Sequence, residues 1–292
     1  MPTSGALQRL IMLEVRRAFT TPSFQLAVAV GCLVAAADAA VFSSESARTL
    51  DRFALYGSSK DCGLTAVSCY VGWVGASHGA FARLFFVLLP LLAALPYCCS
   101  RISDERSGML SQVRLRAGSA RAELAKAVAV FLTSGLAAAI PLASNFALLA
   151  CLNPAAVPQM RDLITLQSGV TTDVVGHGLF YTWPAAFLVL WVTIDFLLMG
   201  LWGTSVLAAT RIFKNRVLLV VGAYLFQMSL AYLTGDFAEA LGRTRISIDL
   251  FVLAYPVGDG AVATPCALFV AVLLMTCLTL SLFICPRRGD FL

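Results

Sequence analysis

The sequence predicts an all-α polytopic membrane protein with six transmembrane helices, preceded by an N-terminal amphipathic helix at the membrane interface. Hydrophobic residues make up 59% of the 292 residues and charged residues only 13%, whereas soluble domains carry about 25% charged residues. The charged residues also cluster, leaving long intervals with almost none. A single soluble core of this length could not bury so much apolar surface. This composition therefore excludes a secreted domain, a cytosolic enzyme and a nucleic-acid-binding protein.

The intervals between charged residues locate the spans, because charges are costly in hydrocarbon and a spanning helix needs about 20 mainly apolar residues. They predict spans near 24–42, 84–100, 126–151, 185–210, 217–234 and 264–285. Pro90 and Pro96 disturb the second span, which we expect to be kinked or tilted. The alternative is a re-entrant segment, which would leave five spans and place the two termini on opposite sides.

The orientation follows from the distribution of lysine and arginine. Fourteen of the 21 basic residues fall on the side that carries both termini, the 101–125 loop and the 211–216 turn. The other seven fall in the three extracytoplasmic loops, 43–83, 152–184 and 235–263. Because basic residues favour cytoplasmic loops, we expect a plasma-membrane protein with both termini in the cytoplasm. The first span is interpreted as a signal anchor, since no cleavage pattern follows it.

The chain contains no pattern typical of a metal, cofactor or catalytic site. Its two histidines and nine cysteines lack zinc-ligand spacing, and none of its three lysines follows a glycine, as a phosphate-binding loop requires. We expect no catalytic residue and no cofactor, and ATP that drives the protein must bind to another chain. Only Cys62 and Cys69 lie well within an outer loop, where their spacing allows a disulfide; a bridge and two free thiols both remain open.

Four polar residues inside the predicted spans are candidates for a pathway or for contacts between helices. Asp195 is central in the fourth span and Asp38 is in the outer half of the first. An ionisable residue in the membrane is by default a functional candidate. For Asp195, a functional and a structural role both remain open, whereas for Asp38 we favour a structural one. Ser134 and Asn145 share one face of the third span and either line a pathway or bond a neighbouring helix, which is the commoner use.

The segment 101–126 is the densest charged cluster on the inner side. Gly108 and Gly118 divide it, and Ser119 is placed to cap the helix that enters the third span. Between the two glycines, apolar residues predict a short helix with one apolar side: Met109, Leu110, Val113 and Leu115. Such a helix suits docking to another protein. The alternative is a solvated positive-inside loop, which needs no such apolar pattern.

This segment resembles the cytoplasmic loop of type-2 ATP-binding-cassette (ABC) transporter permeases. The resemblance rests on the run Ser-Asp-Glu-Arg-Ser-Gly-Met-Leu at 103–110, followed by Arg-x-Gly-Ser at 116–119 and Glu-Leu-x-Lys at 123–126. The amphipathic pattern at 5–20, which stops near Pro22, is similar to the elbow helix of that family. The resemblance implies a coupling element made of Asp104, Glu105, Arg106, Gly108, Met109, Leu110 and Val113.

The function that the resemblance implies is that of a permease subunit of an ABC exporter. Such a subunit forms the pathway for a hydrophobic or amphipathic drug, peptide or lipid, pairs with a second copy or a sister permease, and is driven by a separate ATPase chain. One alternative is an ion-coupled secondary transporter that uses Asp195. Another is a non-transporting immunity or sensor protein of the membrane, which the long outer loops favour.

Overall fold

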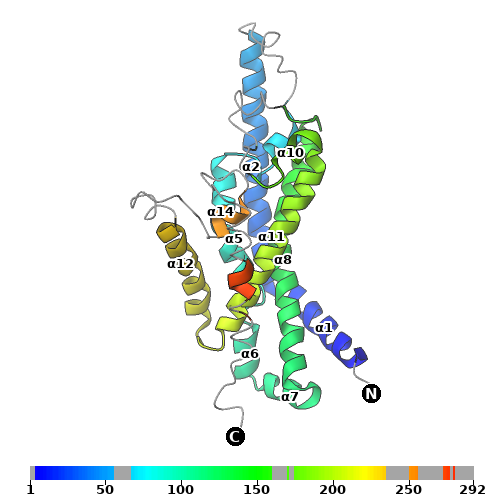
Figure 1. Cartoon of the computed structure of the whole chain (residues 1–292), viewed down its shortest axis with the longest axis vertical. Helices are drawn as coiled ribbons and strands as arrows, with labels where there is room; N and C mark the ends of the chain where they lie inside the picture. Colours follow the sequence, from blue (N-terminus) through cyan, green and yellow to red (C-terminus); the bar gives the residue numbers. More distant parts are fainter. Residues whose placement is uncertain are drawn as a thin grey trace.

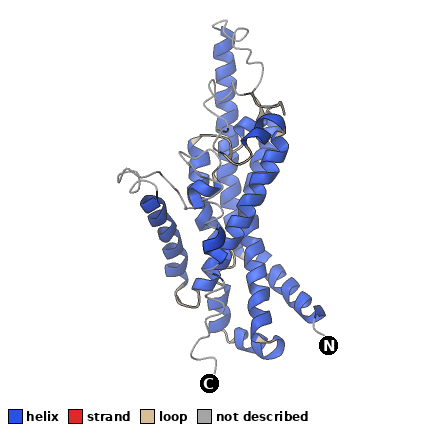
Figure 2. Cartoon of the chain, in the orientation of Figure 1, coloured by secondary structure: helices blue, strands red, loops and turns tan. Residues whose placement is uncertain are grey.

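The chain folds into a bundle of helices, and no strand occurs in the part that the structure describes (Figure 2). The structure is a computed structural model, and it describes residues 4–55, 67–159, 170, 174–234, 250–255, 272–276 and 279. The labelled helices are α1 (Ser4–Phe19), α2 (Pro22–Leu55), α4 (Cys69–Gly72), α5 (Ala80–Ala94), α6 (Ser100–Arg106), α7 (Met109–Ala117), α8 (Ser119–Leu152), α10 (His177–Thr182), α11 (Pro184–Ala209), α12 (Arg216–Thr234) and α14 (Leu250–Ala254).

Four helices among the described residues are long and apolar enough to cross a membrane: α2, α8, α11 and α12. They correspond to the first, third, fourth and fifth predicted spans. Both α11 and α12 begin and end within a residue of the predicted bounds. Most of the sixth predicted span, 264–285, lies outside the described residues, which show helix at 272–276 and at 279.

The second predicted span, 84–100, differs from the helix found there. Helix α5 has 15 residues, a length of about 22 Å at 1.5 Å per residue, which falls short of a hydrocarbon core about 30 Å thick. The helix ends at Ala94, two residues before Pro96, because a proline has no backbone N–H with which to continue the helical hydrogen bonds. Pro90 is accommodated inside the helix.

Two of the long helices extend beyond their predicted spans. Helix α2 continues to Leu55, through charged residues that we assigned to the 43–83 outer loop, and α8 begins at Ser119, within the 101–125 loop. Charged residues set the limit of a membrane span but do not stop a helix. The sequence therefore located the apolar part of each helix. It also placed the start of α8 near Ser119, but it missed the polar extension of α2.

Helix α8 is the centre of the bundle and packs against α11, α2 and α1 (Figure 1). Its closest approach to α11 depends on glycine. A Cβ atom at Gly135 would lie 2.7 Å from the backbone oxygen of Phe196, and one at Gly200 would lie 2.7 Å from the ring of Phe131. Small residues at these positions allow the two helix backbones to approach closely.

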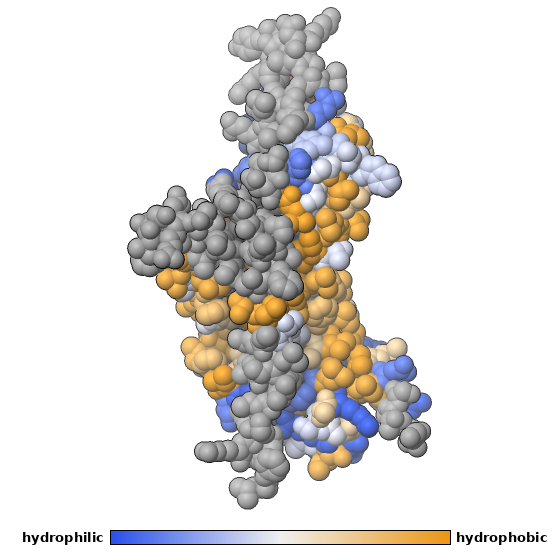
Figure 3. Space-filling model, in the orientation of Figure 1, coloured by the Kyte–Doolittle hydropathy of each residue, from blue (hydrophilic) through white to orange (hydrophobic). Residues whose placement is uncertain are grey.

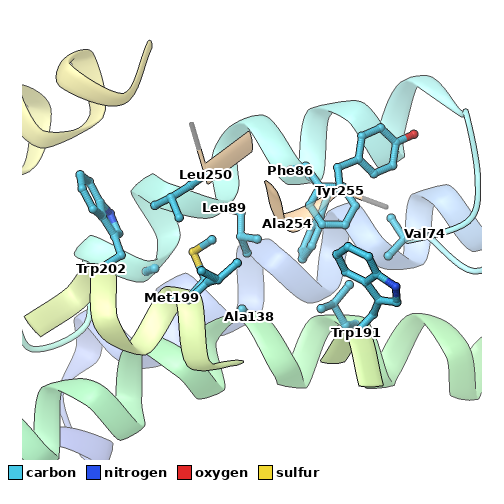
Figure 4. Close-up of a cluster of buried hydrophobic side chains, with 14 of the residues drawn as sticks. Val74, Phe86, Leu89, Ala138, Trp191, Met199, Trp202, Leu250, Ala254 and Tyr255 are labelled. Carbon is cyan, nitrogen blue, oxygen red and sulfur yellow. The ribbon is translucent and has the colours of Figure 1, made fainter. Parts of the chain in front are cut away.

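The core contains a stripe of α11 side chains that face α5 and α14 (Figure 4). Trp191, Met199 and Trp202 belong to this stripe, and Phe86 and Leu89 of α5 pack against it. Residues four apart lie on the same side of a helix. Asp195, four residues from both Trp191 and Met199, therefore lies within this apolar interior.

The outer surface of the bundle is divided along its long axis. On the face that Figure 3 shows, the coloured surface in the middle of the molecule is mostly apolar, and hydrophilic side chains gather at the end that carries α7. We call this the basic end, because arginines occupy both of its short helices: Arg101, Arg106, Arg114 and Arg116.

Candidate functional site: the basic end of the bundle

The basic end is built from two short helices that lead into α8. Gly108 precedes α7 at a φ of 71° and Gly118 follows it at a φ of 86°, and L-residues with a side chain rarely adopt such angles. The helix predicted between these glycines is therefore present, as α7. The predicted cap is not: Gly118 is the N-cap of α8, no side chain caps it, and Ser119 is the first helical residue.

Asp104 joins three helices through two ion pairs. Its Oδ1 atom accepts a hydrogen bond from Nη2 of Arg17 in α1 at 2.8 Å, and its Oδ2 atom pairs with Nζ of Lys126 in α8. The side chains of Asp104 and Lys126 are each 4% exposed. A buried charge is tolerated only when it is paired and hydrogen-bonded, so these two residues depend on each other.

Glu123 makes a second pair of ionic contacts beside the first. Its Oε2 atom accepts from Nη1 of Arg101 at 3.1 Å, and its Oε1 atom accepts from Nη2 of Arg114 at 2.8 Å. Burial lowers the pKa of the Arg101 guanidinium, although the charge of Glu123 opposes this shift. Because Arg101 is in α6, Arg114 in α7 and Glu123 in α8, this carboxylate fixes the two short helices to the long one.

Helix α1 has a second attachment to the basic end. The hydroxyl of Tyr97, in the segment after α5, donates a hydrogen bond of 2.7 Å to Oε2 of Glu14 in α1. Both groups are buried, so this bond fixes α1 to the segment after α5. We name the two carboxylates and their four basic partners the ionic cluster: Arg17, Arg101, Asp104, Arg114, Glu123 and Lys126.

The outward side of the basic end carries a mixed apolar and charged surface. Leu115 is 88% exposed and Met109 is 40% exposed, and both are in α7. Exposed charged residues surround them, and we name the whole set the α7 surface: Glu105, Arg106, Met109, Leu115 and Arg116. An exposed leucine and methionine next to charged side chains are candidates for contact with another protein.

Some of the residues predicted to form the coupling element are exposed at the basic end, and others are buried in it. Glu105, Arg106, Gly108 and Met109 are exposed, Val113 is half-buried, and Asp104 and Leu110 are buried. Asp104 therefore faces the ionic cluster. The sequence placed Leu115 on the apolar side of the short helix that suits docking, but Leu115 was not among the residues assigned to the coupling element, and Arg116 was not identified. Helical spacing was the signal for Leu115, because a residue two positions after Val113 lies on the opposite side of the helix.

Two of the predicted intramembrane polar residues lie at helix contacts. Ser134 of α8 is fully buried, with its hydroxyl 3.9 Å from the sulfur of Cys98. Asn145 is also fully buried. Its Nδ2 atom donates to the Ala35 carbonyl at 2.7 Å, and its Oδ1 atom accepts from the Val74 amide at 2.9 Å. Asn145 therefore links α8 to α2 and to the turn after α4.

The two acidic candidates are both buried inside the bundle. Asp38 in α2 is 3% exposed and its Oδ2 atom has no hydrogen-bond partner. Asp195 in α11 is fully buried, and neither of its carboxylate oxygens has a partner. An unsatisfied buried carboxyl destabilises the protein that contains it. Among the four candidates, Asp195 is therefore the residue whose side chain lacks the most hydrogen bonds.

Only one of the two outer cysteines belongs to the described residues. Cys69 is the first residue of α4 and is fully buried. Cys62 lies outside the described residues. The disulfide between them stays a prediction.

Replacement of Asp195 by leucine is expected to raise the free energy of unfolding in detergent micelles by about 1–3 kcal/mol, because it removes two unsatisfied buried oxygens. Asp195→Asn keeps the shape and much of the polarity, and should gain less. Thermal unfolding followed by circular dichroism measures both variants. A loss of stability in Asp195→Leu would show that the carboxyl has a stabilising partner in the folded protein.

Comparison of the chain with protein-family models, with curated protein sequences and with solved structures finds no match.

Proposed function

We propose that this chain is the membrane-spanning permease subunit of an ABC exporter, and that the α7 surface docks a separate ATPase chain. The observation that carries the proposal is the rigid attachment of α7. A helix that receives force from a partner must pass it to the spans, and the ionic cluster joins α6 and α7 to α8 and α1 through buried charges. The motif at 103–110 supports the same function.

The proposal places the basic end in the cytoplasm, as the distribution of lysine and arginine predicts. Helix α1 then lies at the membrane interface. Met12 and Leu13 support this position, because they are 74% and 64% exposed on a helix whose other side packs on α8. Exposed apolar residues beside arginines are typical of interfacial helices. A second copy or a sister permease completes the pathway for a hydrophobic or amphipathic substrate.

The docking test uses Leu115→Gln, with Leu124→Gln as the control. Leu124 is also exposed, at 51%, but belongs to α8 outside the α7 surface. Tagged chains are purified from their native membrane in mild detergent, and ATP hydrolysis in the eluate is measured. Because burial of a leucine contributes about 1.5–3 kcal/mol, Leu115→Gln is expected to lower the co-purified ATPase activity about tenfold or more, and Leu124→Gln should not.

Two results would contradict this proposal. One is an eluate whose ATPase activity is the same with and without the chain, which would favour a non-transporting membrane protein. The other is equal ATPase activity for Leu115→Gln and Leu124→Gln, which would show that the α7 surface does not dock the ATPase.

Asp195 supports a second candidate function, an ion-coupled secondary transporter. Its unpartnered carboxyl in the interior of the bundle is the specific observation in favour, since such groups commonly carry protons or cations in transporters. Substrate uptake by vesicles is measured across a range of external pH for the wild type and Asp195→Asn. Uptake by Asp195→Asn that keeps its pH dependence would exclude this function.

A further inference from the structure

The structure contains an apolar cleft between α11 and α12 that lies beside the basic end. Its volume is about 730 Å³, within the range of about 300–1,000 Å³ that is typical of ligand sites. The C-terminal half of α11 forms one wall, α12 forms the other, and Leu274 and Met275 contribute to the lining. Helix α12 packs on α5 and α11 at the side of the bundle (Figure 1).

The lining is almost entirely apolar. Among the described residues that line the cleft, Ser205 and Gln227 have the only polar side chains apart from the indole N–H of Trp202. The Ser205 hydroxyl bonds the carbonyl of Leu201 in its own helix, and the Trp202 indole donates to the Pro90 carbonyl. Neither of these two groups is therefore available as a strong polar contact, and the cleft suits a hydrocarbon chain.

The cleft also has the depth of one membrane leaflet. Its wall on α12 runs from Leu218 to Leu230, a rise of about 18 Å at 1.5 Å per residue. Half of a hydrocarbon core about 30 Å thick is about 15 Å. An acyl chain that enters at the 211–216 turn would therefore lie along the cleft for its whole length.

Four basic residues gather at the turn that closes this end of the cleft. The turn reads Arg-Ile-Phe-Lys-Asn-Arg from 211 to 216 and contains no acidic residue. Arg106 of α6 donates to the Lys214 carbonyl at 3.2 Å, and Arg216 donates to the Ser103 hydroxyl at 2.9 Å. Each of these contacts uses one of five guanidinium N–H groups, and the others can still bind phosphate.

We propose that the cleft between α11 and α12 binds an anionic phospholipid, with one acyl chain between the two helices and the phosphate on the basic residues of the 211–216 turn. Charge complementarity at the mouth selects this occupant over a zwitterionic lipid or a neutral hydrophobic molecule. The site does not depend on the proposed ATPase partner.

Gly222 provides a variant that fills the cleft without disturbing the helix. It belongs to the lining, and a Cβ atom built on it meets nothing within 4 Å. Gly222→Phe should therefore occupy the space of the acyl chain. The matched control is Val221→Phe, on the neighbouring residue of α12, which is 46% exposed and outside the lining.

Trp202 in the lining reports the occupant, because brominated acyl chains quench indole fluorescence on contact. All variants carry Trp183→Phe, since Trp183 is 73% exposed. The protein is placed in phosphatidylcholine nanodiscs that contain a minor fraction of brominated phosphatidylglycerol or brominated phosphatidylcholine. We expect the brominated phosphatidylglycerol to quench Trp202 at a concentration at least fivefold lower.

The variants test the acyl-chain cleft and the basic turn separately. Gly222→Phe is expected to remove the quenching of Trp202 by both lipids, and Val221→Phe to leave it unchanged. Lys214→Gln should weaken the preference for phosphatidylglycerol about fivefold, whereas Arg121→Gln, an exposed arginine at the start of α8, should not. Lys214 is in an exposed turn, so its variant tests the proposal even if Gly222→Phe unfolds. Equal quenching by the two lipids, or a preference that survives Lys214→Gln, would overturn the proposal.

Discussion

Replacement of Asp104 by asparagine is expected to lower the free energy of unfolding by about 3–5 kcal/mol, because it leaves the buried Lys126 ammonium without its counter-charge. Arg17, whose side chain is 40% exposed, can turn to water. The Lys126 side chain is only 4% exposed, so its ammonium group cannot reach water in this way. Thermal or denaturant unfolding in one detergent measures the loss. Asp104→Asn is thus among the most disruptive single substitutions at the basic end.

The matched control is Asp51→Asn, the same change at an exposed carboxylate of α2, which should change stability by less than about 0.5 kcal/mol. The double variant Asp104→Leu with Lys126→Met removes both charges and should recover most of the loss, since apolar pairs commonly replace buried ion pairs without cost. If Asp104→Asn is as stable as Asp51→Asn, the ion pair is hydrated and does not hold α6 against α8.

This result bears on how the docking of a partner is tested. Asp104 is in the segment that the sequence assigns to coupling, yet it faces the ionic cluster. A variant at Asp104 that loses function would do so through the position of α6, whatever α7 contacts. Leu115 is 88% exposed, so its substitution tests the contact itself.

The long helices could be predicted from the sequence because the membrane imposes a simple rule on them. The predicted bounds of α11 and α12 match the helices to within a residue, and charged residues mark three of these four ends: Arg211 follows α11, and Arg216 and Asp236 stand at the two ends of α12. The same rule failed for α5. Its apolar interval continues to Ser100, whereas the helix ends at Ala94, because Pro96 acts on the backbone and leaves the hydropathy unchanged.

The direction of each side chain at the basic end could not be predicted. The sequence showed a charged segment with a short helix, and α7 is present. Whether Asp104 faces outward or inward depends on where α6 rests against α8, and its partner Lys126 is 22 residues away. The cleft between α11 and α12 could not be predicted either, because the pattern of residues within each helix does not show how far apart the two helices lie.

Replacement of Asn145 by alanine is the second substitution for which we expect a large effect, a loss of about 2–4 kcal/mol in the free energy of unfolding. The amide joins three parts of the chain, with bonds to the Ala35 carbonyl and the Val74 amide. The alanine variant leaves the buried Val74 N–H unsatisfied, which costs about 1–3 kcal/mol, and opens a small cavity. The Ala35 carbonyl belongs to α2 and keeps its bond within that helix.

Asn153→Ala provides the control, because Asn153 ends the same helix and makes one half-buried bond to the Ser43 hydroxyl at 3.1 Å. It should cost less than about 1 kcal/mol. The comparison also decides what the polar face of α8 does. An asparagine that lines a pathway would change transport and leave stability near that of Asn153→Ala. An asparagine that bonds helices together would lower stability first, and the loss of transport would follow from the loosened contact between α8 and α2.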